Sequence, residues 1–358
     1  MKKINILYTI WGTSFGGAEK FVLNVVKCLN KDKYNIVIFS DSDKIGPLKK
    51  EYEKAGAKVI ISKYHRFKHP IKFIRQIKSV VADEGINIIH ANDDYNMIFS
   101  LVVKSKAIRY VAHSHSTKFF FTKSKIATFF ARIIIPAIIR NKADVLVGCS
   151  NEAGDKLFSR KKYMVIPNGI EMNNFIYSDK NRNCTRKKMK IKNDEKVILN
   201  IGRMDNAKNQ TALIDIFANY HAMNDNSKLL IIGNGPERKN IENKVSKLGL
   251  TKSVSILEPQ KDICDYYNAA DVFVMTSKFE GLPMVLIEAQ ANGLPVVAST
   301  TISSESKIND NFEFINLDDD YNEWTNTIQK MKRQKPNKTI GQYSIETSSR
   351  RLEKIYES

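Results

Sequence analysis

Short apolar runs alternate along this chain with longer segments in which apolar residues recur every three or four positions. The runs are residues 4–10, 36–39, 86–90, 110–113 and 145–148 in the first half, and 197–202, 228–233, 253–257, 271–275 and 295–298 in the second. Runs that are apolar throughout, rather than at alternate positions, are typical of parallel strands covered by helices on both faces. The pattern therefore predicts an α/β protein with two doubly wound parallel sheets.

The boundary between the two predicted domains is expected just after Pro167-Asn168-Gly169. The first domain then spans residues 1–170 and the second residues 171–343, with the polar, lysine-rich stretch 178–196 as the expected linker. Ligands of open α/β sheets bind beyond the carboxyl ends of the strands. We therefore expect two Rossmann-like domains that face each other across a cleft lined by those ends.

The composition is that of a soluble globular protein with room for two domains, since the 358 residues are 42% hydrophobic and 27% charged. The four cysteines, Cys28, Cys149, Cys184 and Cys264, are far apart and lack metal-ligand spacing, which favours a reducing cytoplasm. The apolar run near residue 4 is too short to span a membrane and has no cleavage site, so we interpret it as a buried strand.

Net positive charge is concentrated in the first half of the chain. Residues 1–170 contain 30 Lys and Arg against 13 Asp and Glu, whereas residues 171–358 contain 27 against 25. Between Asp94 and Asp144 there are nine basic residues and no acidic one. A one-sided basic field attracts a polyanion, either nucleic acid or an anionic membrane. A genome-wide preference for lysine codons would not explain the difference between the halves.

The same basic stretch contains Phe119-Phe120-Phe121, followed by residues 126–138 with apolar side chains at helical spacing. A basic, aromatic-rich amphipathic segment can lie in a membrane interface. For the apolar stripe alone, a core helix of the first domain is the favoured interpretation. The absence of acidic residues favours membrane contact.

The most informative motif is the glutamate pair Glu280 and Glu288. It follows the apolar run 271–275, and Pro283 suits the first position of a helix. Glu280 is therefore expected on the loop before a helix and Glu288 within it. Backbone N–H groups at a helix start bind anions, and carboxylates accept hydrogen bonds from hydroxyls. A ligand with both a phosphate and sugar hydroxyls fits this combination.

Three further motifs stand at the ends of predicted strands. Gly16 and Gly17 follow the first strand, where adjacent glycines allow a ligand close to the backbone. Arg203 and Lys208 follow the first strand of the second half, and together they suit a diphosphate. Gly233 ends the next strand, where it leaves room for a flat base or a ribose. Taken singly, each glycine motif is equally compatible with a plain turn, and for the two cations alone solvated surface positions are favoured.

Two histidines, His113 and His115, end the strand that begins at residue 110, and strand alternation points them to the same side. Zinc would require a further ligand, and none stands at a recognisable spacing. A hydrogen bond from a histidine to a substrate is therefore favoured over a metal site and over an inert core role.

In their order along the chain these motifs resemble the retaining, nucleotide-sugar-dependent glycosyltransferases of family 4, which have the two-domain GT-B fold. The resemblance covers nearly the whole chain and is greatest to the subgroup that builds bacterial exopolysaccharide or capsule. It is carried by residues 16–19, 113, 166–170, 202–203, 208–209, 233–236, 262–267, 269–271, 280, 288–289 and 293–295.

The resemblance implies that the second domain binds the donor. Glu288 would bind the ribose hydroxyls and Glu280 the hydroxyls of the donor sugar, while Arg203 and Lys208 would neutralise the leaving diphosphate. Gly233 would also line the nucleotide site. The segment Gly281, Leu282, Pro283 and Met284 would lie near the sugar and the phosphate, with backbone N–H groups from Gly281 onward.

In the first domain, the resemblance implies that Gly16 and Gly17 approach the donor phosphate and that His113 lies near the donor sugar and the acceptor. His115 is a second candidate for that role. No metal is expected, because in GT-B enzymes cationic side chains and a helix N-terminus take over its electrostatic role.

One segment departs from the family. Most members have a glycine-rich stretch after Ser299, whereas residues 300–308 here contain no glycine. Which groups complete the site on that side therefore stays open. The last helix, expected within residues 344–358, would cross back to the first domain as in the fold generally.

The function implied is that of a retaining hexosyltransferase, with a UDP-sugar as the expected donor and a lipid-linked glycan as the acceptor. It would lie in the cytoplasm, bound peripherally to the anionic inner face of the membrane, with no nucleic-acid partner. Three alternatives remain. A GT-B sugar-nucleotide epimerase shares the fold and the donor. A glycoside hydrolase also uses two carboxylates. A nucleic-acid-binding protein would explain the charge alone.

Overall fold

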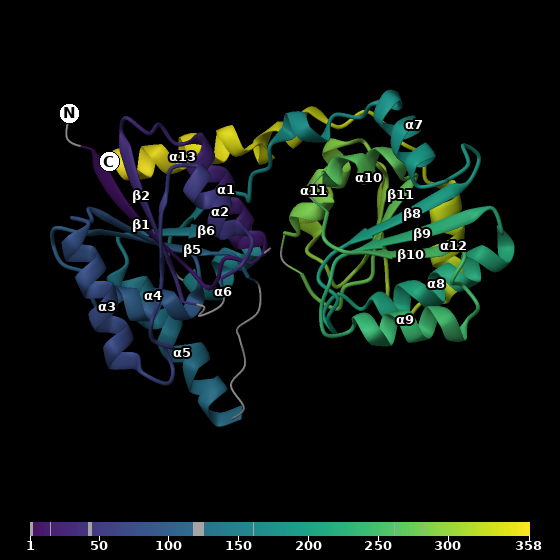
Figure 1. Ribbon diagram of the computed structural model, residues 1–358. Helices are drawn as coiled ribbons and strands as arrows, with labels where there is room; N and C mark the ends of the chain where they lie inside the picture. Colours follow the sequence, from purple (N-terminus) through teal and green to yellow (C-terminus); the bar gives the residue numbers. More distant parts are fainter. Residues whose placement is uncertain are drawn as a thin grey trace. The chain divides into compact units, whose positions relative to one another are not determined.

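The computed structural model describes residues 3–14, 16–41, 45–116, 125–159, 161–260, 262–280 and 282–358. It forms two compact units: unit 1 comprises Met1–Ile170 with Gln342–Ser358, and unit 2 comprises Glu171–Gly341 (Figure 1). Phe119-Phe120-Phe121 and Gly281, to which the sequence assigns a membrane contact and a donor contact, lie outside the described residues.

Unit 1 contains a seven-stranded parallel sheet within its described residues, in the order β3-β2-β1-β4-β5-β6-β7. The strands are β1 (Ile4–Ile10), β2 (Tyr34–Ser40), β3 (Lys58–Ile61), β4 (Ile88–Ala91), β5 (Arg109–Ser114), β6 (Val145–Gly148) and β7 (Met164–Val165). Continuous apolar strands bury side chains on both faces, as the sequence predicts. Leu7, Phe39 and Ile89, for example, lie in one buried cluster with helical residues such as Phe73 and Leu157.

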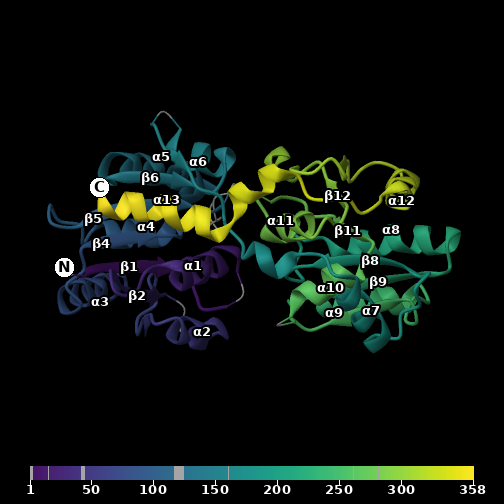
Figure 2. The same cartoon turned by 90° about the horizontal axis from the view of Figure 1, so that it is seen from above.

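The helices of unit 1 are α1 (Gly17–Cys28), α2 (Leu48–Lys54), α3 (Pro70–Asp83), α4 (Asp94–Leu101), α5 (Lys125–Lys142), α6 (Asn151–Phe158) and α13 (Ile345–Glu357). The last helix, α13, returns to unit 1 after the whole of unit 2, as expected, and packs beside α1 (Figure 2). It buries Ile345, Leu352, Ile355 and Tyr356 at helical spacing.

Unit 2 contains a six-stranded parallel sheet within its described residues, in the order β10-β9-β8-β11-β12-β13. The strands are β8 (Lys196–Ile201), β9 (Ser227–Ile232), β10 (Val254–Leu257), β11 (Val272–Met275), β12 (Val296–Ser299) and β13 (Phe312–Ile315). The helices are α7 (Asp179–Lys188), α8 (Gln210–Met223), α9 (Arg238–Lys247), α10 (Ile263–Ala269), α11 (Met284–Ala291) and α12 (Tyr321–Lys330), with 3₁₀ turns η1 (Met172–Phe175), η2 (Ser304–Ser306) and η3 (Lys338–Tyr343).

The order of the strands reverses once in each sheet, between β1 and β4 in unit 1 and between β8 and β11 in unit 2. At such a switch point the loops leave the two neighbouring strands in opposite directions, and their carboxyl ends border the usual ligand site of a doubly wound sheet.

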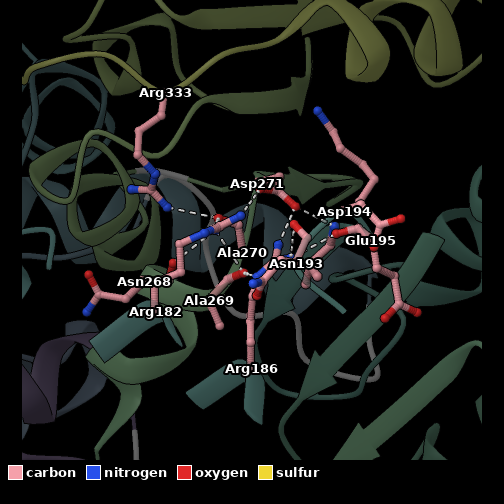
Figure 3. A network of polar contacts seen from close by, with 12 residues as sticks. Arg182, Arg186, Asn193, Asp194, Glu195, Asn268, Ala269, Ala270, Asp271 and Arg333 are labelled. Carbon is pink, nitrogen blue, oxygen red and sulfur yellow. Dashed lines mark hydrogen bonds and ion pairs between the residues drawn. The ribbon is translucent and has the colours of Figure 1, made fainter. Parts of the chain in front are cut away.

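The expected linker, residues 178–196, is wrong, because this stretch contains α7 and the start of β8. Arg186 on α7 is buried, with its Nη2 2.7 Å from Asp271 Oδ2 and its Nε donating to the Ala269 carbonyl at 2.9 Å. Arg182 pairs with the other oxygen of Asp271 at 2.6 Å (Figure 3). The guanidinium groups satisfy carbonyl oxygens at the end of α10, which a helix leaves without internal partners. The basic stretch is therefore folded against unit 2.

A third arginine binds the same end of α10. Arg333, which follows α12, donates from Nη2 to the carbonyl oxygens of Tyr267 at 2.8 Å and Ala270 at 2.9 Å. Its guanidinium also lies 4.3 Å from the ring centroid of Tyr177. Helix α7 near the start of unit 2 and the segment after α12 near its end therefore both bind the carboxyl end of α10 (Figure 3).

Candidate functional site

The candidate donor residues of unit 2 follow two strands at the switch point. Arg203 and Lys208 lie on the loop after β8, and Glu280 lies on the loop after β11. The two strands are hydrogen-bonded neighbours, with Phe273 opposite Leu199. The fold therefore brings together loops that are about seventy residues apart in sequence.

Hydrogen bonds tie the two loops to each other. The backbone N–H of Lys278 donates to the carbonyl of Ala207 at 2.8 Å, and Thr276 Oγ1 donates to the carbonyl of Asn209 at 3.0 Å. Asn209 has a left-handed backbone (φ 53°), a conformation that asparagine tolerates better than most residues. This turn was not predicted, because one asparagine in a polar loop has no distinctive sequence pattern.

Lys208 and Glu280 form an ion pair, with Nζ 2.5 Å from Oε1 and about a fifth of each side chain exposed. The stem of Lys208 passes over Gly202: a Cβ at Gly202 would lie 3.5 Å from its Cδ and Cε. The cation predicted to meet a diphosphate and the carboxylate predicted to meet a sugar therefore contact each other directly. The site can present a positive charge and a hydroxyl acceptor side by side.

The segment after β12 fixes the backbone around Glu280. Ser299 Oγ and Thr301 Oγ1 both donate to the carbonyl of Ser277 at 2.6 Å. Ile302 forms an isolated parallel bridge with Glu280. Thr301, in the stretch that lacks the expected glycines, and the neighbouring Ser299 therefore support the glutamate loop.

Glu288 lies in α11, and Glu280 on the loop before it, as predicted; the helix begins at Met284, one residue after Pro283. Glu288 is 1% exposed and accepts a hydrogen bond from Tyr267 Oη at 2.7 Å. Burial and the neighbouring Glu288 raise the pKa of Tyr267 well above its usual value, so the phenol keeps its proton and remains a donor. Tyr267 therefore orients this carboxyl group, a role that sequence reasoning did not assign.

The remaining residues of the α11 start are apolar and packed. Leu282, Pro283 and Met284 are all buried. The carbonyl of Pro283 accepts the first helical hydrogen bond, from the N–H of Leu286 at 3.0 Å. Their predicted closeness to a sugar and a phosphate stays a prediction.

Arg203 differs from Lys208 in its surroundings. Its side chain is 64% exposed, and its Nε lies 3.7 Å from Asp205 Oδ2. Its backbone is better fixed, because its carbonyl accepts a hydrogen bond from Gln210 Nε2 at 3.0 Å. The loop is thus held in shape while the guanidinium stays in solvent.

Gly233 has a packing role in the structure. A Cβ there would lie 1.9 Å from the carbonyl oxygen of Gly202, so only glycine allows the ends of β8 and β9 to approach this closely. Gly235 packs in the same way, 2.2 Å from the Met204 carbonyl oxygen by the same measure. Local packing explains both glycines, and the nucleotide contact predicted for Gly233 stays a prediction.

The two glycines that open α1 in unit 1 are not equivalent. A Cβ at Gly16 would lie 2.1 Å from Oε2 of Glu19, whose carboxyl group folds back over it. At Gly17 nothing lies within 4 Å. Burial raises the pKa of Glu19 to about 7. Open space beside the backbone, which the sequence predicted for both glycines, is therefore found at Gly17, whereas at Gly16 a side chain of the protein occupies it.

His113 lies near the end of β5 and His115 directly follows the strand, with ring centroids 4.0 Å apart. Both nitrogens of His115 lie 2.9 Å from an amide oxygen, of Asn168 on one side and Asn92 on the other. His113 is fully buried, and its Nε2 has no hydrogen-bond partner among the described residues. Burial, followed by the neighbouring His115 and His90, holds the pKa of His113 well below its usual value. His113 therefore has a ring nitrogen available for a ligand, whereas His115 is held in place on both sides.

Across the part of the chain that the structure describes, no three His, Cys, Asp or Glu side chains are grouped so as to hold a metal ion. Nor is any helix among these residues both long and apolar enough to cross a bilayer.

Two family models match successive parts of the chain. Residues 15–174 match the model described as Glycosyltransferase Family 4. Residues 181–346 match the model described as Glycosyl transferases group 1. The two matches together extend over most of both units.

Similar proteins of known description are glycosyltransferases. EpsF of Bacillus subtilis is 27% identical over 84% of this chain and 80% of its own length. CapH of Staphylococcus aureus, a capsular polysaccharide biosynthesis glycosyltransferase, is 25% identical over 99% of both chains. An Escherichia coli enzyme named UDP-Gal:alpha-D-GlcNAc-diphosphoundecaprenol alpha-1,3-galactosyltransferase is 24% identical over 68% of this chain and 67% of its own.

Solved structures share the fold. HepE of Anabaena, in complex with UDP and glucose, is similar with a TM-score of 0.83 over 99% of this chain and 100% of that one, at 19% identity. The two parallel-sheet units and this likeness confirm the predicted GT-B fold.

Proposed function

This chain belongs to glycosyltransferase family 4, and from that membership we propose that it transfers a sugar from a UDP-sugar to a lipid-linked glycan in exopolysaccharide or capsule biosynthesis. The similarity to CapH, which is named for capsular polysaccharide biosynthesis, supports the pathway class. The UDP and glucose bound by HepE support the donor. The diphosphoundecaprenol in the name of the E. coli relative supports a lipid-linked acceptor.

The observation that carries the proposal is the Lys208–Glu280 pair at the switch point of unit 2. A nucleotide sugar has a diphosphate that suits Lys208 and sugar hydroxyls that suit Glu280. On donor binding, Lys208 would exchange the carboxylate for phosphate oxygens, and Glu280 would exchange the ammonium group for hydroxyl donors. The backbone N–H groups at the start of α11 would add to the positive potential at the diphosphate. Glu288, oriented by Tyr267, would accept hydrogen bonds from the ribose.

The proposed reaction retains the configuration of the sugar. The acceptor hydroxyl attacks the anomeric carbon on the face that the diphosphate leaves, the bond from that carbon to the phosphate oxygen breaks, and the hydroxyl proton passes to the departing diphosphate. Lys208 and Arg203 would stabilise the negative charge as it develops, which is the largest contribution in many enzymes of this kind. These cations and the helix start would make a metal unnecessary, and we expect activity to persist in excess EDTA.

A thermal-shift comparison of UDP, GDP and ADP with the full chain tests the donor. A ligand at one hundred times its dissociation constant stabilises the folded state by about 2.7 kcal/mol, so UDP alone should raise the melting temperature clearly. Product analysis with a UDP-sugar and a polyprenyl-diphosphate saccharide tests the transfer. An epimerase would change the donor without acceptor and a hydrolase would release free sugar; either product pattern, in place of an extended acceptor, contradicts the proposal.

A further inference from the structure

The return of α13 to unit 1 places a tyrosine inside the core of that unit. Tyr356 is 4% exposed, and it lies against Tyr8 of β1 and His90 of β4, both fully buried. The ring centroids of Tyr8 and His90 are 4.9 Å apart in a stacked arrangement, and those of His90 and His113 are 5.3 Å apart. A group of polar rings thus leads from the last helix to the end of β5.

Three hydrogen bonds connect these rings in series. Tyr8 Oη lies 2.6 Å from Tyr356 Oη, and Tyr356 Oη lies 2.6 Å from His90 Nδ1. His90 Nε2 in turn lies 3.2 Å from His113 Nδ1. The series ends at His113 Nε2, which is buried and has no hydrogen-bond partner among the described residues.

The hydrogens can run through the series in two directions. If Tyr8 donates to Tyr356, then Tyr356 donates to His90 Nδ1, His90 donates from Nε2 to His113 Nδ1, and His113 carries its hydrogen on Nε2. In the opposite direction His113 donates from Nδ1, and the hydroxyl hydrogen of Tyr8 is left without an acceptor in the protein core.

The first direction leaves fewer buried polar groups unsatisfied. It leaves one, the Nε2–H of His113, which a ligand oxygen can accept. The opposite direction leaves two, the Nε2 lone pair of His113 and the hydroxyl hydrogen of Tyr8. Because an unpaired buried polar group is costly, the first direction is favoured.

Ionisation does not compete with this choice. Burial lowers the pKa of His90 to about 3 and that of His113 well below its usual value. Burial raises the pKa of both Tyr8 and Tyr356 above their usual value. All four groups are therefore neutral near pH 7, and the state of His113 is a question of tautomer only.

We propose that Tyr356, acting through His90, is a positioning residue that holds His113 as the Nε2–H tautomer, so that it donates a hydrogen bond to a substrate oxygen. The proposal rests on the proposed function, in which His113 meets the donor sugar and the acceptor. It also assigns the chemistry: with its Nε2 hydrogen in place, His113 binds a hydroxyl or phosphate oxygen and does not remove a proton from the acceptor.

Histidine-selective ¹⁵N labelling of the full chain tests the tautomer without any activity measurement. The chain contains six histidines, so long-range ¹H–¹⁵N correlation spectra will be simple to assign with single variants such as His113→Gln. We expect His90 and His113 both as Nε2–H tautomers, unchanged between pH 8 and pH 6. A His113 that carries its hydrogen on Nδ1, or that titrates in this range, overturns the proposal.

The variant Tyr356→Phe removes one hydroxyl and keeps the ring. We expect His113 to populate both tautomers, and kcat to fall about two- to tenfold as the competent fraction falls, with KM for the donor unchanged. Tyr8→Phe gives the opposite expectation, because Tyr356 then has His90 Nδ1 as its remaining acceptor and His113 should stay the Nε2–H tautomer. An unchanged His113 spectrum in folded Tyr356→Phe, or mixed tautomers in Tyr8→Phe, contradicts the proposal.

Tyr34→Phe is the matched control. Tyr34 donates to Glu357 of the same helix at 2.7 Å and packs against Tyr356 with ring centroids 6.1 Å apart, but it lies outside the series. If weaker docking of α13 were the cause, Tyr34→Phe would lower kcat as much as Tyr356→Phe. Failure of the proposed function is distinguishable, since full activity of His113→Ala would contradict the role of His113 while leaving the tautomer measurement valid.

Discussion

At the scale of single residues, the ion pair of Lys208 with Glu280 is the feature from which the site is best understood. Each group partly neutralises the other. A partly exposed pair of this kind contributes little to stability. The ion pair holds the lysine side chain beside the position where a sugar would bind. The lysine is therefore already ordered before the donor binds.

Replacement of Lys208 with methionine should impair transfer without unfolding unit 2. A hydrogen bond to a charged group contributes roughly 1.5–3 kcal/mol, so we expect kcat/KM to fall about ten- to a hundredfold. Lys244→Met is the matched control, because Lys244 forms an equally short ion pair with Asp215, at 2.5 Å. The side chains of that pair are exposed to a similar extent. Equal losses in the two variants would show that the pair at Glu280 has no special role.

At the scale of elements, the sequence predicted the strands well, since each of the ten apolar runs overlaps an observed strand. It missed β3, β7 and β13. β3 is half exposed, β7 has two residues, and β13 contains Glu313. None of these has the continuous apolar pattern of a strand buried on both faces. Edge strands of a sheet are therefore the part that periodicity detects least.

The placement of Glu280 before α11 and of Glu288 within it was predicted, because the motif contains its own helix-start signal. The site was not predicted where a role depends on a partner distant in sequence. Tyr267 orients Glu288 from another helix, and Arg186 binds carbonyl groups some eighty residues away. Such partners are chosen by the fold, and a single sequence contains no signal for them.

The segment after β12 offers a test of how the glutamate loop is supported. Thr301→Val removes the hydroxyl that donates to the carbonyl of Ser277 and keeps the shape of the side chain. The variant loses one of the two hydrogen bonds to this carbonyl, and a hydrogen bond contributes about 1 kcal/mol. We therefore expect kcat/KM to fall about three- to tenfold. Thr300→Val, at the exposed neighbouring position, is the control and should change little. No difference between the two variants would show that this segment does not position the loop.

At the scale of the whole molecule, the net positive charge belongs almost entirely to unit 1. On α5 of that unit, Ile133 is 55% and Ile134 51% exposed, next to the exposed Arg132. Exposed apolar residues among basic ones suit an anionic bilayer surface, where each basic residue contributes about 1 kcal/mol. We propose that unit 1 binds the inner face of the membrane peripherally.

Vesicle sedimentation tests the membrane proposal. The chain should bind vesicles that contain phosphatidylglycerol, release them as salt is raised, and ignore vesicles of phosphatidylcholine alone. Ile134→Asp should weaken binding, whereas Met223→Asp, at a position of unit 2 that is 64% exposed, should not. Equal binding to neutral vesicles would remove the electrostatic argument. Binding to nucleic acid instead, with a steep salt dependence, would favour the competing interpretation of the charge.

The buried histidines make the stability of unit 1 depend on pH. Burial lowers the pKa of His90 to about 3, that of His115 to about 4 and that of His113 well below its usual value. In the unfolded chain these groups bind protons near pH 6.5. The unfolded state therefore binds more protons as the pH falls from 6.5 towards 4, and stability that is complete above 6.5 is lost across that window. Each histidine contributes a slope of up to about 1.4 kcal/mol per pH unit.

Glu19 acts in the opposite sense. Burial raises its pKa to about 7, so between about pH 4.5 and 7 the folded chain holds a proton that the unfolded chain releases. It offsets one of the three histidines, and a net loss of stability towards low pH remains.

Hydrogen exchange at pH 7, 6 and 5, corrected for intrinsic rates, measures this pH dependence unit by unit. Protection of β4 and β5 should fall as the pH is lowered, while that of β8 and β9 in unit 2 should change little. A uniform change in both units would contradict the assignment to these histidines.

The position of α13 has a consequence for the order in which the chain is made. Unit 1 needs Ile345–Glu357 to complete its core, yet unit 2, Glu171–Gly341, is synthesised in between. At translation rates of about 5–20 residues per second, the first 170 residues wait roughly ten to thirty seconds for their last helix. During that time Tyr8 and His90 lack their tyrosine partner, and the apolar surface that α13 covers is exposed to the cytosol. We expect the nascent first unit to bind chaperones in this interval, because the segment that sets its histidine is made only after unit 2.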